Sequence, residues 1–248
     1  MNEMAVLITG GSSGIGLAIA EKFAADGAQV FINYHADDDA AIKACDKLNS
    51  AGGDAVAIKS DIGTEDGVRS LVGEVTVHAD RLDLIVHCAA ATYPGLLVDI
   101  PHSDLVRSVM VNGLALVALV SEARPLLGAG SGVIYVSSQG ARQAIRGYGA
   151  LGIAKALGEH TIRYLAVELA REGIRFNTVS PGMLDTKAVR AMFPGKFERI
   201  AESAARLNPS SRPLDFDDVA STVEMISRPE FAMMQGQVIS VDGGASLR

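Results

Sequence analysis

The sequence has no tryptophan, and only 5% of its residues are aromatic. It has two cysteines, Cys45 and Cys88, which are too few for a disulfide framework and lack the spacing of a metal site. This cysteine usage favours a reducing compartment. We therefore expect a cytoplasmic protein that binds no metal.

Long apolar runs are missing as well. The longest, GLALVALV at 113–120, is far shorter than the ~20 residues that cross a bilayer. The first ten residues, MNEMAVLITG, lack the charged and apolar regions of a signal peptide. The net charge is -7 and the basic residues are scattered, which disfavours nucleic acids and anionic membranes as partners. We expect a small soluble substrate instead.

What is present is an alternation of β-rich apolar runs with amphipathic segments of helical spacing. Strands alternating with helices indicate repeated βαβ units, and strands that are apolar on both faces are typical of a covered parallel sheet. The pattern predicts an α/β, Rossmann-like, doubly wound sheet of about seven strands with helices on both faces, in one domain over 1–248. The predicted strands are 5–9, 29–34, 55–58, 82–87, 132–137, 174–180 and 237–242; the predicted helices are 15–25, 40–49, 68–77, 105–127 and 148–171.

The interval 186–214 breaks this rhythm, because it is long, helix-prone and interrupted by Pro194, Gly195, Pro209 and Pro213. It follows the sixth predicted strand, near the carboxyl ends where open α/β sheets bind ligands. We predict a substrate-binding lid here; a surface helical insertion is the alternative.

The segment TGGSSGIG at 9–16 follows the first predicted strand and opens the first helix. In that context a glycine-rich turn predicts a dinucleotide site, because the helix amino terminus directs N–H groups at a pyrophosphate. Gly10 allows the tight turn, Gly14 lets the backbone approach the phosphates, and Gly16 permits close packing. An ordinary βα turn is the alternative. The residues expected to bind here are Gly10, Ser12, Ser13, Gly14, Ile15 and Gly16.

Further motifs follow in order along nearly the whole chain: VNG around Asn112, SS at 137–138, YGALGIAK at 148–155, SPG at 180–182 and VDGG at 241–244. With the glycine-rich loop, they resemble the short-chain dehydrogenase/reductase superfamily. The resemblance implies an NAD(P)-dependent oxidoreductase with Tyr148, Lys155, Ser138 and Asn112 as catalytic residues. It also implies cofactor contacts from Tyr34, Asp61, Ile62, Ala89, Lys155, Pro181, Gly182 and Thr186.

The form of the cofactor depends on the end of the second strand. The sequence NYH at 33–35 lacks the Asp or Glu that would bind a ribose 2′-hydroxyl, which favours NADPH. Ser13, where NADP-dependent relatives often have a basic residue, and the acidic run 37–39 speak for NADH. We expect NADPH, with NADH as the alternative, and read the acidic run as a solvated helix start.

The tyrosine is displaced from its usual position in the superfamily. Many members have it four residues before the lysine, but here that residue is Leu151, and Tyr148 stands seven before Lys155. Both spacings return to one helix face, and the shift moves the phenol by roughly 4.5 Å along the axis. A shifted proton donor suits 1,4-reduction, where the oxygen lies two carbons beyond the carbon that receives hydride. The pattern resembles the NADPH-dependent Y-x6-K enoyl-acyl-carrier-protein reductases.

That resemblance implies reduction of an enoyl thioester of fatty-acid or related acyl metabolism, presented on acyl carrier protein or coenzyme A. The intact Ser138 keeps a carbonyl reductase as the alternative, and a non-catalytic cofactor-binding protein is the third hypothesis. Two departures are HCAA at 87–90, where many members have NNAG, and Ala144, where this branch tends to have a second tyrosine. Apolar and small residues around the helices at 103–127 and 148–170 predict a homo-oligomer, and the resemblance implies a tetramer.

Overall fold

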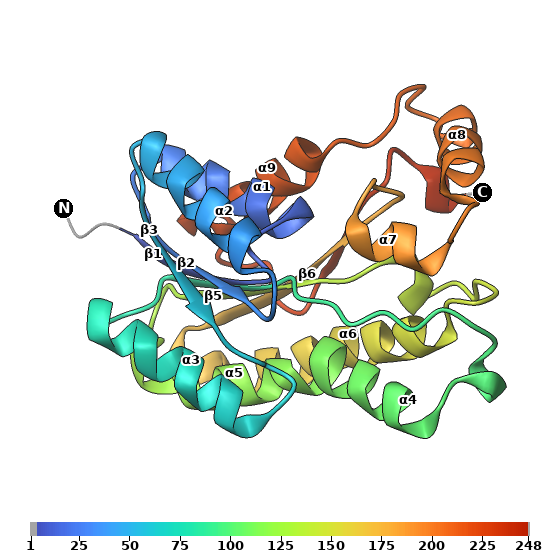
Figure 1. Ribbon diagram of the computed structural model, residues 1–248. Coiled ribbons are helices and arrows are strands. Elements are labelled where there is room, and N and C mark those ends of the chain that lie inside the picture. The colour runs from blue at the N-terminus through green and yellow to red at the C-terminus, as the bar shows by residue number, and fades with distance from the viewer. Residues whose placement is uncertain (1–3, 248) are drawn as a thin grey trace.

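The computed structural model describes residues 4–247, apart from the side chain of Leu207, and contains one parallel sheet of seven strands (Figure 1). The strand order is β3-β2-β1-β4-β5-β6-β7, as a doubly wound fold requires. The strands are β1 (Ala5–Thr9), β2 (Gln29–Tyr34), β3 (Asp54–Lys59), β4 (Leu84–His87), β5 (Gly132–Val136), β6 (Arg175–Pro181) and β7 (Val238–Val241). All seven lie within one or two residues of the predicted runs.

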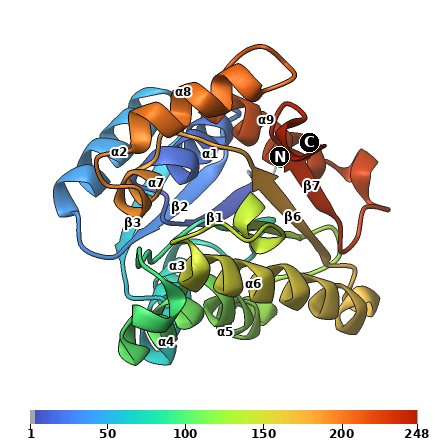
Figure 2. The ribbon, with the colours of Figure 1, turned by 90° about the vertical axis from the view of Figure 1, so that its right-hand side faces the viewer.

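Helices cover both faces of this sheet, as predicted (Figure 1). One face carries α1 (Gly14–Ala25), α2 (Asp38–Ser50) and α9 (Phe216–Ser227). The other carries α3 (Glu65–His78), α4 (His102–Val109), α5 (Ala115–Ala123) and α6 (Gly149–Glu168). The short helices α7 (Lys187–Met192) and α8 (Phe197–Leu207) lie near the carboxyl ends of the strands, on the side of α1 and α2 (Figure 2).

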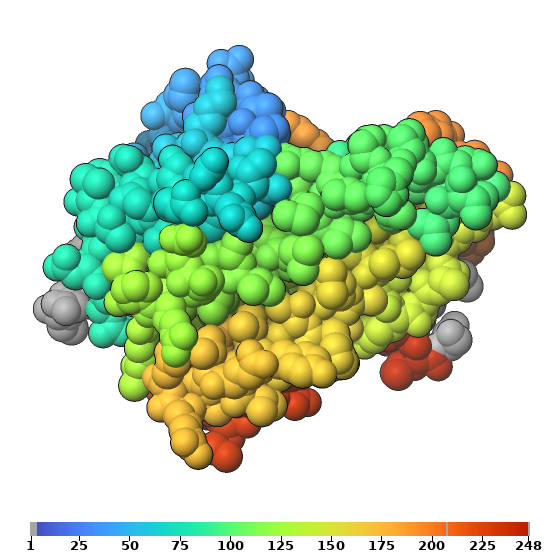
Figure 3. All heavy atoms as spheres, turned by 90° about the horizontal axis from the view of Figure 1, so that it is seen from below, coloured from blue at the N-terminus to red at the C-terminus, as the bar shows by residue number. Residues whose placement is uncertain are grey.

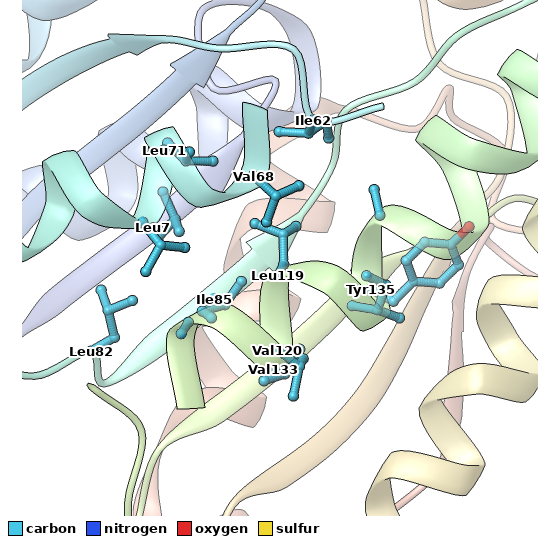
Figure 4. Packing of buried hydrophobic residues seen from close by; sticks show 14 of the residues in the cluster. Leu7, Ile62, Val68, Leu71, Leu82, Ile85, Leu119, Val120, Val133 and Tyr135 are labelled. Carbon is cyan, nitrogen blue, oxygen red and sulfur yellow. The ribbon is translucent and has the colours of Figure 1, made fainter. Parts of the chain in front are cut away.

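Side-chain alternation divides the core into two layers. In β1, Leu7 faces α3 and α5, whereas Val6 and Ile8 face α1 and α9. Figure 4 shows the first layer, where Leu119 and Val120 of α5 meet Leu7 and its neighbours over the sheet. Burial on both faces explains why these strands are continuously apolar.

The predicted helix 105–127 differs from the observed one. The observed helix begins earlier, at His102. A π-helical turn, η2 (Met110–Leu114), divides it into α4 and α5. Asn112 therefore lies within this turn, and not in a regular helix as the prediction of a continuous helix implied. Such turns often occur at functional sites because they turn a side chain out of the regular helical register.

The stretch His102–Leu126 is long and apolar enough to cross a membrane by length and composition alone. The α5 part of this stretch, however, contributes Leu116, Leu119 and Val120 to the core. Of the most apolar 18-residue window within the stretch, 44% is buried. We conclude that the stretch is a core helix of this fold. The longest uninterrupted apolar run, 113–120, covers only part of this stretch.

The sheet has its topological switch point between β1 and β4. From β1 the chain adds β2 and β3 on one side and then returns to place β4 on the other. Because the connections leave β1 and β4 in opposite directions, a crevice forms beyond their carboxyl ends, where open α/β sheets bind ligands.

Candidate active site

A cavity of about 810 Å³ lies beyond the carboxyl ends of the central strands. It extends from the ends of β2 and β3, across the glycine-rich loop, to the ends of β5 and β6. Most of the expected site residues line it: Gly10, Ser12, Ser13, Gly14, Ile15, Tyr34, Asp61, Ile62, Ala89, Ser138, Tyr148, Lys155, Pro181, Gly182 and Thr186. Gly16 and Asn112 do not line it and lie behind this surface.

The glycine-rich loop has the geometry of a phosphate-binding turn. Gly10 and Gly14 have φ angles of +67° and +55°, which favour glycine. A Cβ on Gly16 would lie 2.3 Å from the carbonyl oxygen of Gly10, so Gly16 lets the helix pack on the loop itself. Near Gly14 the closest such contact is Thr186 at 3.7 Å. The backbone of the loop therefore faces open cavity at the amino terminus of α1.

His87 forms hydrogen bonds that connect backbone segments lining the cavity. Its Nδ1 accepts a hydrogen bond from the Thr9 hydroxyl at 2.8 Å, and its Nε2 donates to the Val111 carbonyl at 3.1 Å. Thr9 Oγ1 in turn accepts from the Cys88 and Ala89 amides. Full burial lowers the pKa of His87 to about 3, so the ring is neutral. These bonds hold the backbone of the HCAA segment at 87–90 in place.

At the end of the cavity beside β2 and β3, the acidic run starts α2 as expected. Asp37 is the helix N-cap and accepts from the Ala40 amide at 3.1 Å, while Asp38 and Asp39 occupy the first turn. Asp61 accepts hydrogen bonds from Arg107 of α4 and from the Gly63 amide, whereas the N-cap of α3 is Thr64, whose hydroxyl accepts from the Gly67 amide. The arginine partner was missed because no local pattern connects α4 to β3.

Tyr148 and Lys155 line the same cavity, although Tyr148 is not inside the helix. Helix α6 begins at Gly149, and Tyr148 is its N-cap residue with φ -108° and ψ 5°. Tyr148 therefore stands one residue before the helix, whereas the prediction placed it at the first helical position, and both residues still reach one cavity as predicted. The Tyr148 carbonyl accepts from the Gly152 amide at 2.8 Å, which fixes Tyr148 against the first turn.

The environment of the tyrosine holds its phenol protonated. Tyr148 is 8% exposed, and burial raises the pKa of its phenol, with the neighbouring Ser138 hydroxyl opposing part of that shift. Ser138 Oγ is buried and has no fully formed hydrogen bond within residues 4–247. A buried hydroxyl without a partner beside a phenol can bind a substrate oxygen.

Lys155 is the buried cation of the site. It is 4% exposed, its Nζ donates to the Val136 carbonyl at 2.7 Å, and it lies 4.8 Å from the centre of the Tyr135 ring. Burial lowers the pKa of Lys155 to about 8, while the Cys88 thiol and Glu159 act in the opposite direction. Glu159, one turn along α6, accepts from the Ser137 hydroxyl at 2.6 Å.

Asn112 connects the π-helical turn to the loop after β4. Its side chain donates to the Ala91 and Ser108 carbonyls, each at 2.8 Å, and accepts from the Ala91 amide. Its own carbonyl accepts from the buried Tyr135 hydroxyl. Asn112 therefore holds a backbone segment of the cavity wall. The Tyr135 contact was missed because β5 reads as an ordinary apolar strand.

Segment 186–214 supplies one wall of the cavity. Thr186 caps α7 by accepting from the Val189 amide at 3.0 Å, which leaves its O–H able to donate. Phe193, directly after α7, stacks on Tyr148 with ring centres 6.4 Å apart and planes at 13°. Lys187, Val189 and Phe193 line the cavity. The ring contact with Tyr148 could not be read from the sequence.

The comparisons agree with this geometry. A family model described as enoyl-(acyl carrier protein) reductase matches residues 10–246. The 1-cyclohexenylcarbonyl-CoA reductase of Streptomyces collinus is 33% identical over 97% of this chain and 86% of its own length. The NADH-dependent enoyl-[acyl-carrier-protein] reductase of Aquifex aeolicus is 28% identical, with 96% and 89% covered. A blue fluorescent protein from a metagenomic library, solved with NADPH, superimposes with TM-score 0.89 at 29% identity, with 99% and 98% covered.

The sheet, the glycine-rich loop and these relatives define an NAD(P)-dependent oxidoreductase. The chain belongs to the short-chain dehydrogenase/reductase superfamily, in the family of the enoyl-(acyl carrier protein) reductase model. This conclusion sets aside the hypothesis of a non-catalytic cofactor-binding protein.

Proposed function

We propose that this enzyme reduces the carbon–carbon double bond of an enoyl thioester with NADPH. The observation that carries the proposal is the displaced tyrosine. Leu151, four residues before Lys155, and Tyr148 both line the cavity and share an apolar cluster with Met192, but only Tyr148 has a hydroxyl that can donate a proton. The relatives that reduce enoyl thioesters on acyl carrier protein or coenzyme A support this substrate class.

The residues present fit a nicotinamide dinucleotide. The glycine-rich loop would offer backbone N–H groups to the pyrophosphate, Asp61 and Ile62 would hold the adenine, and Ala89, which follows β4, lines the centre of the cavity. Pro181, Gly182 and Thr186 would hold the carboxamide end. When bound, NADPH supplies the hydride that the β-carbon of the substrate accepts.

Tyr148 then acts on the thioester oxygen. As charge develops on that oxygen, the phenol donates a hydrogen bond to it and then a proton, and the resulting enol tautomerises to the saturated thioester as the α-carbon gains a proton and the oxygen releases one. Lys155 favours this transfer by its positive field and binds ribose hydroxyls. Asn112 keeps the Ala91 backbone in place beside the reacting groups.

Carbonyl reduction remains the second candidate because of Ser138. Its buried, unpartnered hydroxyl beside Tyr148 suits a ketone oxygen that is bonded directly to the hydride-accepting carbon.

One experiment decides between the two reactions. Oxidation of NADPH and of NADH is followed with crotonyl and acetoacetyl thioesters, each on coenzyme A and on acyl carrier protein. We expect turnover with the crotonyl thioester and NADPH. Faster turnover of acetoacetyl thioesters contradicts the proposal and favours the carbonyl reductase.

A further inference from the structure

An ion pair joins two distant segments at the adenosine end of the cavity. Lys187, the first residue of α7, donates through Nζ to Asp37 Oδ2 at 2.9 Å. Both residues line the cavity, together with Tyr34 and His35 at the end of β2. This is the end where relatives of this fold distinguish a ribose 2′-hydroxyl from a 2′-phosphate.

Two carboxylates near this point, Asp37 and Asp38, are already engaged. Asp37 accepts from the Ala40 amide as well as from Lys187, and both contacts lower the pKa of its carboxyl group. Asp38 pairs with Lys59 at 2.8 Å and is not among the residues that line the cavity. The acidic run is therefore a weaker barrier to a phosphate than its sequence suggests.

Lys187 is free to change partners. Its side chain is 76% exposed and that of Asp37 is 53% exposed, and solvent-exposed ion pairs of this kind contribute little to stability. A phosphate carries more charge than a carboxylate and offers three acceptor oxygens, so it competes well for an ammonium group. Arg107, the other cation that lines this end, is held by Asp61.

The position of Lys187 links this contact to the catalytic tyrosine. Helix α7 runs from Lys187 to Met192, a length of roughly 9 Å at the usual helical rise. The next residue, Phe193, stacks on Tyr148. A ligand that holds Lys187 therefore holds the segment that covers the reacting end.

We propose that Lys187 recognises the 2′-phosphate of the cofactor from the lid, so that NADPH holds the lid over the site more firmly than NADH does. This inference rests on the NADPH preference proposed above. It assigns the discrimination between the two cofactors to a residue 150 positions along the chain from Asp37, and not to the end of β2, where a carboxylate is missing.

Binding of 2′,5′-ADP and of 5′-ADP, measured by calorimetry, tests this contact without nicotinamide or substrate. We expect Lys187→Gln to weaken 2′,5′-ADP about tenfold, which equals ~1.4 kcal/mol, and to change 5′-ADP less than twofold. Asp37→Asn, which keeps an acceptor for the helix cap, should strengthen 2′,5′-ADP. The control is Lys47→Gln, another exposed lysine paired with a carboxylate, Glu21, away from the cavity.

Hydrogen exchange of the amides at 187–193 tests the lid. In the native protein 2′,5′-ADP should slow this exchange more than saturating 5′-ADP does, and Lys187→Gln should remove the difference. Equal affinity of the native protein for the two nucleotides overturns the NADPH preference together with this inference. A preference for 2′,5′-ADP that survives in Lys187→Gln, equal weakening of both nucleotides, or unchanged lid exchange overturns this inference alone. Enoyl reduction is not tested by these measurements.

Discussion

The phenol of Tyr148 is buried and protonated, and its proposed task is to stabilise charge that develops during the reaction. Tyr148→Phe keeps the ring that packs on Phe193 but removes the donor. We expect turnover to fall about a hundredfold or more, on the order of 3 kcal/mol, while cofactor affinity stays within twofold. Steady-state rates and a nucleotide titration measure the two effects. Full turnover in this variant would show that Tyr148 is not the proton donor and would make Ser138 the next candidate.

Glu159 is placed to set the ionisation of Lys155 from behind the site. The groups around the ammonium are Glu159, Cys88, Tyr135 and neutral His87; among them Cys88 and Glu159 raise the pKa of Lys155 against the effect of burial. If protonated Lys155 is required, kcat/KM falls above pH 8 or so.

We expect Glu159→Gln to move this alkaline limit to lower pH, because the lysine then loses a stabilising negative charge. The pH profile of kcat/KM measures the limit. Glu168→Gln, an exposed position near the end of the same helix, is the control and should leave it in place. A limit that does not move with Glu159→Gln means that the carboxylate is structural only.

Some site residues could be identified from their type and local sequence context alone. Gly10 and Gly14 were located by the strand and helix around them, and their positive φ angles agree with the turn that the motif predicts. His87 and Phe193 could not be found, because their roles depend on partners at Thr9 and Tyr148, far away in the sequence. Such contacts arise only when the fold brings separate segments together.

Among the elements, helix α6 illustrates how one glycine fits a helix to the sheet. A Cβ on Gly158 would lie 2.3 Å from Cζ of Tyr135, whose hydroxyl binds the Asn112 carbonyl. Glycine is therefore required here despite its cost in a helix. Gly73 in α3 is different, since nothing lies within 4 Å of its Cβ position.

These two glycines give opposite predictions. Gly158→Ala should lower the free energy of unfolding by about 1–3 kcal/mol, because the ring of Tyr135 must move. Gly73→Ala should raise it by roughly 0.5–1 kcal/mol, because alanine is the better helix former. Urea unfolding measures both. A neutral Gly158→Ala would show that helix and strand can separate without loss.

Element boundaries were predictable where the pattern of apolar residues alone sets them. All seven strands were found because a covered parallel strand is apolar on both faces. The division of 102–123 by the π-helical turn was not predictable, since neither composition nor spacing marks it. The placement of Tyr148 outside α6 was missed for a similar reason: a residue one position before a helix has the same spacing as one inside it.

On the whole molecule, one helical face remains apolar and exposed. Figure 3 shows this face, with α5 in green and α6 in yellow side by side. Its exposed apolar residues are Val106, Leu114, Val117, Ile153, Tyr164 and Val167. We propose that this face pairs with a second copy of the chain, as the expected tetramer requires.

Light scattering tests the assembly. We expect a mass of about four times 25.9 kDa at micromolar concentration. Val167→Glu, a charge on the exposed face of α6, should reduce the mass, because burying an unpaired carboxylate is costly. Val77→Glu on α3 is a control of similar exposure and should leave the mass unchanged. A native mass near 26 kDa contradicts the tetramer.

The neutral ring of His87 also makes the molecule sensitive to acid. In the unfolded chain this histidine accepts a proton near pH 6.5, whereas in the fold it resists protonation down to about pH 3. Acid therefore favours the unfolded chain: stability is greatest above pH 6.5 and falls as the pH decreases, by roughly 2–3 kcal/mol at pH 4.5. Lys155 adds no pH dependence to the free energy of unfolding between pH 4.5 and 6.5, because its pKa of about 8 in the folded protein lies above this range. Urea unfolding at pH 7 and 4.5 should show the loss in the native protein and a smaller one in His87→Asn. The same ring that joins β1 and β4 at the switch point thus limits the acidity that the fold withstands, and equal losses in both proteins would contradict this.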